Sequence, residues 1–175
     1  FDKAYRGLGE ISLILRSGKE NGFVDLEFFR ALDALEAELA ALPGVGAVYG
    51  PTDLVKEALA RWEGGGAYAV QPRSQADIGE SLELLTSAGG GLFSRGFVDP
   101  SWSSANLRIS VSPGFKATTE YLPFKARAEK AIHAKLPGAE VLWAGDVVRA
   151  SIHQRAFIGG QLNGGLVFFA FLFIG

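Results

Sequence analysis

The stretches LPGVGAVYG (residues 42–50) and LPGAEVLWAG (residues 136–145) share one pattern and decide the fold of this chain. Each begins with Leu-Pro-Gly, which ends a helix because neither proline nor glycine readily continues one. Each then runs on as a short apolar strand, and each follows an amphipathic helix that itself follows an alternating strand. A strand–helix–strand unit therefore occurs twice, near residues 9–50 and 106–145, which indicates a repeated supersecondary unit.

Alternation of apolar and polar residues predicts the leading strand of each unit. GEISLILR (residues 9–16) and LRISVS (residues 107–112) both place every second side chain on an apolar side, which is the period of a half-buried strand. The first long helix is capped by Asp25, where a carboxylate suits the helix dipole. The second is expected to be capped by Thr118 or Thr119.

Two split βαβ units in one sheet predict an α+β, ferredoxin-like sandwich, with an antiparallel sheet and both long helices on one face. The residues between the units, about 51–105, are then a helical and loop insertion. Within it we expect a short helix from Thr52 or Asp53 to Trp62, a helix over residues 74–87, and a strand fragment over residues 97–102.

The end of the chain is strongly apolar. Residues 156–175 carry no charge, and a transmembrane helix needs roughly 20 such residues. We therefore expect residues 1–155 to form a domain outside the membrane and residues 156–175 to begin a transmembrane helix. A buried C-terminal helix of a soluble fold, or a hydrophobic tag, is the alternative reading.

Composition narrows the possible functions. The 175 residues include no cysteine, so disulfides and cysteine-held metals are excluded, and the net charge of −2 gives no basic surplus for nucleic-acid binding. The chain lacks methionine and begins with Phe1, so we expect it to be a piece of a longer protein.

The two long helices differ in charge. The first helix is rich in aspartate and glutamate, and the second is rich in lysine and arginine. If the two helices lay side by side, these oppositely charged side chains would attract each other. Ordinary solvated faces explain the same residues, because exposed ion pairs contribute well under about 1 kcal/mol each.

No catalytic signature is present, and we expect no catalytic residue, no cofactor and no metal. The glycines of residues 44–50 follow a helix and run through a strand, unlike a dinucleotide-binding loop. His133 and His153 have no second ligand at metal spacing. Asp146 is the most interesting carboxylate, although a helix cap explains it.

The order of elements resembles the first extracytoplasmic loop of an exporter of the resistance–nodulation–division (RND) superfamily. The residues that carry the resemblance are LPGV at 42–45, PTDL at 51–54 and WAG at 143–145. The match is nearest to the branch that moves lipids and other hydrophobic molecules, to which Patched-like proteins are distantly related.

This resemblance implies a porter domain between the first and second membrane helices, held at the inner (cytoplasmic) membrane and facing the periplasm or the cell exterior. Its partners would be a hydrophobic small molecule or lipid, the membrane, and a second porter loop of the same parent protein, with no nucleic acid. Proton-driven transport would use residues of other membrane helices. Phe97 and Trp102, which lie near turns, are expected to be partly exposed and to guide the substrate.

Two other classes of function remain open from the sequence. One is a ferredoxin-like sensory or adaptor module, tethered by one span, that binds a small ligand or a partner protein. The other is a soluble enzyme with a buried C-terminal helix.

Overall fold

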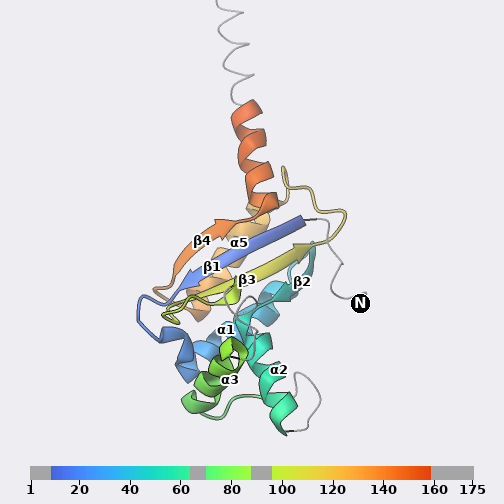
Figure 1. Cartoon of the computed structure of the whole chain (residues 1–175). Coiled ribbons are helices and arrows are strands. Elements are labelled where there is room, and N and C mark those ends of the chain that lie inside the picture. The colour runs from blue at the N-terminus through green and yellow to red at the C-terminus, as the bar shows by residue number, and fades with distance from the viewer. Residues whose placement is uncertain (1–8, 64–69, 88–95, 159–175) are drawn as a thin grey trace, which may run out of the picture.

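The computed structural model describes residues 9–63, 70–87 and 96–158, which form an α+β domain. Its four-stranded sheet is antiparallel throughout, in the order β2-β3-β1-β4. The elements are β1 (Gly9–Arg16), η1 (Gly22–Val24), α1 (Leu26–Ala40), β2 (Val45–Tyr49), α2 (Pro51–Glu63), α3 (Gln75–Ser87), β3 (Ser104–Val111), α5 (Tyr121–Lys135) and β4 (Glu140–Ala144). Residues 146–158 form a further helix that leaves the domain at one end (Figure 1).

The centre of the sheet is built from the two alternating strands. Leu13 of β1 is paired with Leu107 of β3 on one side and with Trp143 of β4 on the other. Burying one such leucine contributes about 1.5–3 kcal/mol. The predicted alternation is confirmed, because these side chains are fully buried: Ile11, Leu13, Leu15, Leu107 and Ile109.

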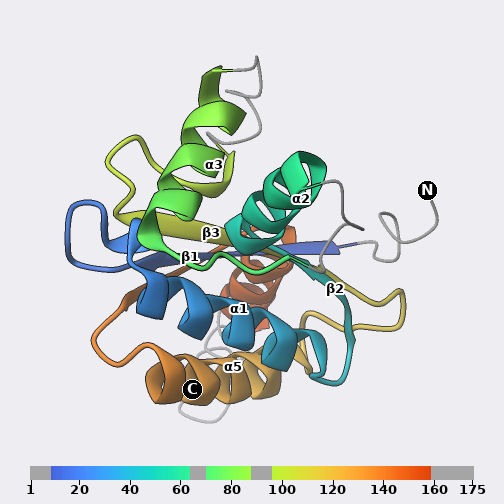
Figure 2. The same cartoon turned by 90° about the horizontal axis from the view of Figure 1, so that it is seen from below.

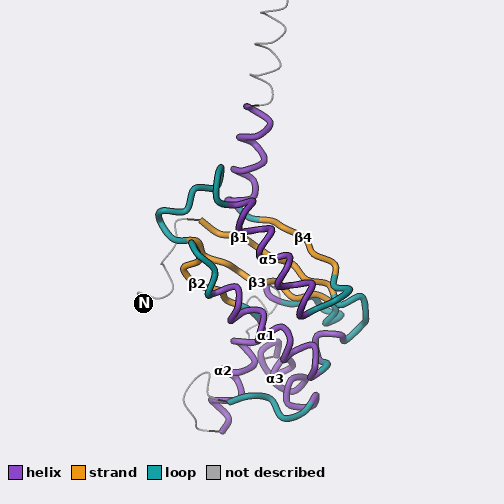
Figure 3. The backbone as a smooth tube through the Cα atoms, turned by 180° about the vertical axis from the view of Figure 1, so that it is seen from behind, coloured by secondary structure: helices purple, strands orange, loops and turns teal. Residues whose placement is uncertain are grey.

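Helices α1 and α5 lie side by side over one face of the sheet (Figures 2 and 3). Each turns an apolar stripe toward the strands: Leu32, Leu35 and Leu39 from α1, and Phe124, Ala128 and Ile132 from α5. An ion pair of 3.3 Å between Lys135 and Glu38 joins the two helices. Both partners are partly exposed, so the pair adds little to the packing of the two stripes.

The two Leu-Pro-Gly stretches have the same backbone form. Gly44 has a φ of 84° and Gly138 a φ of 90°, so both adopt the left-handed conformation that commonly follows a helix. The strands that follow them, β2 and β4, are the two outer strands of the sheet. Each unit thus begins in the centre and ends at an edge, with a strand of the other unit between its own two.

The insertion supplies α2 and α3, as predicted. These helices pack against each other at the end of the domain opposite the helix of residues 146–158 (Figure 1). A reciprocal cap begins α3: Asp77 donates its backbone N–H to the Ser74 hydroxyl, and its carboxylate accepts the N–H groups of Arg73 and Ser74.

Two local predictions are wrong. The expected strand over residues 97–102 is instead a helical turn at residues 96–97 and a single bridge from Val98 to Ala105. The expected threonine cap of α5 is absent, because Thr118 and Thr119 lie in the preceding turn and Glu120 occupies the N-cap position. The Glu120 carboxylate accepts the backbone N–H of Lys116 and so closes that turn.

Within residues 9–63, 70–87 and 96–158, no helix is long and apolar enough to cross a bilayer. Most of the predicted start of a transmembrane helix, residues 159–175, lies outside the described residues.

Candidate functional site

Phe97 is buried beneath charged and aromatic neighbours. Its side chain is 4% exposed, so the expectation of a partly exposed ring is wrong for this residue. The guanidinium carbon of Arg108 lies 4.9 Å from the ring centre, a cation–π distance. The ring of Tyr49 lies 6.4 Å away and is itself 42% exposed. We call these three residues, Tyr49, Phe97 and Arg108, the aromatic cluster. Its accessible apolar surface belongs to Tyr49.

Trp102 is half-buried in a tight turn. Its φ of 53° is left-handed, an uncommon conformation for a bulky residue. Its backbone N–H donates to the carbonyl of Asp99, and its own carbonyl accepts the N–H of Phe23. The indole packs against the hydrophobic core with part of its surface exposed, as expected. The turn therefore fixes Trp102 against η1.

Asp99 holds that turn together. Its carboxylate accepts backbone N–H groups from Ser101, Ser103 and Ser104 and hydroxyl groups from the same serines. Burial alone would raise the pKa of Asp99, but these hydrogen bonds outweigh it and hold the pKa well below its usual range. The ionised carboxylate is thus a structural brace of the segment that carries Trp102.

The structure does not join Phe97 and Trp102 into one site. Among the described residues, no ring contact links the two side chains. Their role in a substrate path stays a prediction.

A groove of about 330 Å³ lies where β4 meets the helix of residues 146–158. Trp143, Val148 and Ile152 contribute apolar surface, and Ile152 is 61% exposed. Asp146 lines the groove and forms an ion pair with Arg149, three residues along the helix. This groove combines apolar walls with charged groups at the base of the protruding helix.

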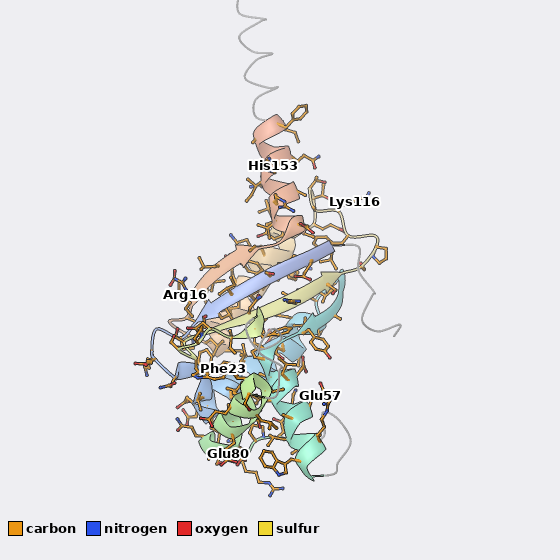
Figure 4. The ribbon with its side chains drawn as sticks, viewed as in Figure 1. Arg16, Phe23, Glu57, Glu80, Lys116 and His153 are labelled. Carbon is orange, nitrogen blue, oxygen red and sulfur yellow. The ribbon has the colours of Figure 1, made fainter. Side chains whose placement is uncertain are left out.

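Titratable side chains lie at both ends of the domain (Figure 4). His153 and Lys116 lie at the end from which the helix of residues 146–158 leaves, whereas Glu57 and Glu80 lie at the end formed by α2 and α3. His133 and His153 are both exposed. In the described parts of the chain, no group of histidine, aspartate and glutamate side chains could hold a metal ion.

The structure also reveals a buried polar cluster between α1 and α2 that sequence reasoning missed. We call Asp33, Glu36, Thr52, Asp53 and Lys56 the α1–α2 cluster. Glu36, Thr52 and Lys56 are at most 9% exposed, so Glu36 does not belong to the solvated face that is one interpretation of its acidic helix. A signal was present: Glu36 lies four residues after Leu32 and three before Leu39, so it falls on the apolar stripe.

No family model matches the chain, and no curated protein matches it in sequence.

Proposed function

We propose that this chain is the extracytoplasmic porter domain of an RND-type exporter of lipids or other hydrophobic compounds. It acts at the inner membrane by binding substrate and by conformational gating, without bond chemistry. We also propose that its fold is the ferredoxin-like split βαβ sandwich and that a transmembrane helix follows it.

One observation carries the proposal: two interleaved strand–helix–strand units are followed at once by a helix that leads out of the domain. The first strands of the two units pair at the centre of the sheet, and their last strands form its edges. The helix of residues 146–158 begins directly after β4, and the sequence beyond Arg155 is uncharged and apolar. This is the arrangement expected of a domain whose chain returns to a membrane.

Basic side chains at the protruding end are compatible with a membrane on that side of the domain. Lys116 lies in the loop before α5 and His153 on the helix of residues 146–158 (Figure 4). The same helix carries Arg155, and Arg149, which is paired with Asp146. Basic side chains near a membrane surface are attracted to anionic lipid headgroups. The end formed by α2 and α3 then points away from the bilayer.

Trp102 is the better candidate of the two aromatic residues for contact with substrate. Phe97 is covered by its neighbours, whereas the indole of Trp102 keeps part of its surface accessible. The groove beside Trp143 and Ile152 offers a second apolar surface, close to where a substrate leaving the membrane would meet the domain.

Replacement of Trp102 by alanine in the parent protein tests the role of this side chain. We expect lower export of a hydrophobic substrate while thermal unfolding shows that the fold is retained. Trp62→Ala is the matched control, because Trp62 is a tryptophan of α2 that is 64% exposed and belongs to neither the Asp99 turn nor the groove beside Trp143. Unchanged export by the folded Trp102→Ala protein would rule the role out.

The parent gene tests the class of protein. Several further spans and a second copy of this loop would support an exporter. A single span followed by a signalling domain would contradict the proposal and favour a tethered sensory or adaptor module.

A further inference from the structure

Glu36 and Thr52 form the inner layer of the α1–α2 cluster. Glu36 is 6% exposed and Thr52 has no exposed surface. The Thr52 hydroxyl donates to Oε2 of Glu36, whereas Oε1 has no hydrogen-bond partner within the described residues. An ionised carboxylate accepts several hydrogen bonds in water, so this site satisfies only part of that capacity.

The unpartnered oxygen faces one stretch of backbone and one apolar side chain. The carboxyl group lies against the backbone of Gly50, at the junction of β2 and α2. The side chain of Leu107, from β3, closes the same space. The backbone N–H of Gly50 already donates to Oδ2 of Asp53 at 3.1 Å, and the Leu107 side chain has no donor. The slot therefore suits a neutral carboxyl group better than a charged one.

The outer layer supplies only one counter-ion, and it is shared. Nζ of Lys56 lies 2.5 Å from Oδ1 of Asp33 and 3.8 Å from Oδ1 of Asp53. Gln71 donates to the other oxygen of Asp33 at 3.1 Å. Lys56 is therefore shared by two aspartates, and a charge on Glu36 would be a third negative charge beside one cation.

We propose that Glu36 is a proton-binding site that couples the packing of α2 against α1 and β3 to pH. The neutral carboxyl group holds the first turn of α2 against α1 and β3. The ionised group leaves an unmatched charge in the apolar slot, so the site favours movement of α2 away from α1.

The electrostatics agree with this geometry. Burial raises the pKa of Glu36 to about 8, with Asp53 and Asp33 adding to the rise, while the Thr52 hydrogen bond and Lys56 oppose it. Burial also raises the pKa of Asp53. The charged groups that act on Glu36 thus come from α1 (Asp33) and α2 (Asp53 and Lys56), whereas β3 contributes Leu107.

Hydrogen exchange on the full 175-residue chain in a mild detergent tests the proposal. After correction for the intrinsic pH dependence of exchange, we expect the amides of α2 to exchange at least about tenfold faster near pH 9 than near pH 6, because local opening exposes them. Glu36→Gln, which keeps the shape of the neutral form, is expected to remove this difference.

Glu38→Gln is the matched control, because Glu38 lies on the same helix, is about half exposed and pairs with Lys135. It is expected to keep the full pH response. A wild-type chain whose α2 exchange does not change with pH would overturn the proposal, as would a Glu36→Gln chain that keeps the response.

A direct titration of the wild-type chain tests the same proposal without a variant, so it does not depend on whether Glu36→Gln folds. We expect the side-chain carboxyl carbon of Glu36, followed by NMR in the wild-type chain, to titrate far above the ordinary glutamate value of about 4.3. An ordinary midpoint would overturn the proposal. Both experiments concern the isolated chain, so their failure would not bear on the exporter assignment.

Discussion

The carboxyl group of Glu36 lies directly against the backbone of Gly50, at a position where no side chain fits. A Cβ atom placed on Gly50 would also lie 2.6 Å from a methyl group of Leu107. The two residues come from different elements, α1 and the junction of β2 with α2, so their contact fixes where α2 begins relative to the sheet.

We therefore predict that Gly50→Ala destabilises the domain by about 1–3 kcal/mol, because overpacking forces the Glu36 carboxyl or Leu107 to move. Chemical denaturation measures the change. Gly114→Ala serves as the control, since a Cβ there meets nothing within 4 Å. Equal stability of the two variants would show that the contact with Glu36 is loose.

Stability should fall as pH rises through the range in which Glu36 titrates. Its pKa is raised from 4.5 to about 8 in the folded chain, so between these values the folded chain binds the proton more tightly than the unfolded chain does. The contribution is complete below about pH 4.5 and is lost progressively toward about pH 8, with a limiting slope of about 1.4 kcal/mol per pH unit.

Denaturant unfolding of the wild type and of Glu36→Gln at a series of pH values checks this prediction. The difference between the two free energies of unfolding is expected to grow with pH across that range. Parallel curves would contradict it.

The two helix-ending glycines should differ in their tolerance of alanine. Both have a left-handed φ, which costs a residue with a side chain roughly 1–2 kcal/mol. At Gly138 a Cβ meets nothing within 4 Å, whereas at Gly44 it lies 2.7 Å from the ring of Phe115. We expect Gly44→Ala to lower the melting temperature more than Gly138→Ala, and the reverse order would show that the Phe115 ring yields freely.

The brace formed by Asp99 should be sensitive to acid. Its pKa is held low in the folded chain, so its contribution to stability is present above about pH 4 and is lost as the pH falls below that value. We expect Asp99→Ala to cost about 1 kcal/mol at neutral pH, as the loss of a helix cap does. Unfolding curves at neutral and acidic pH measure both effects, and a variant as stable as the wild type would contradict this role.

The fold was largely predictable because its signals are local. Alternation placed Leu13 and Leu107 on buried faces, and Leu-Pro-Gly located the helix end at Gly44. These signals depend on residues near in sequence and on the period of a strand or helix. The repeated unit also predicted an antiparallel sheet with both long helices on one face.

The candidate site was less predictable because it depends on contacts between distant elements. Glu36 belongs to a helix whose acidic residues are explained by a solvated face, yet contacts with Thr52 of α2, Gly50 and Leu107 of β3 bury it. Phe97 was expected to be partly exposed, yet Arg108 and Tyr49 pack on its ring. Side chains that meet across the sheet leave little trace in the local pattern.

Transport by the parent protein is the most direct test of the exporter assignment. The parent protein would be reconstituted into lipid vesicles, and the movement of a hydrophobic fluorescent compound would be followed with and without a proton gradient. We predict transport that requires the gradient and stops when an ionophore dissipates it. Movement that is indifferent to the gradient, or no movement beyond that in protein-free vesicles, would contradict the account.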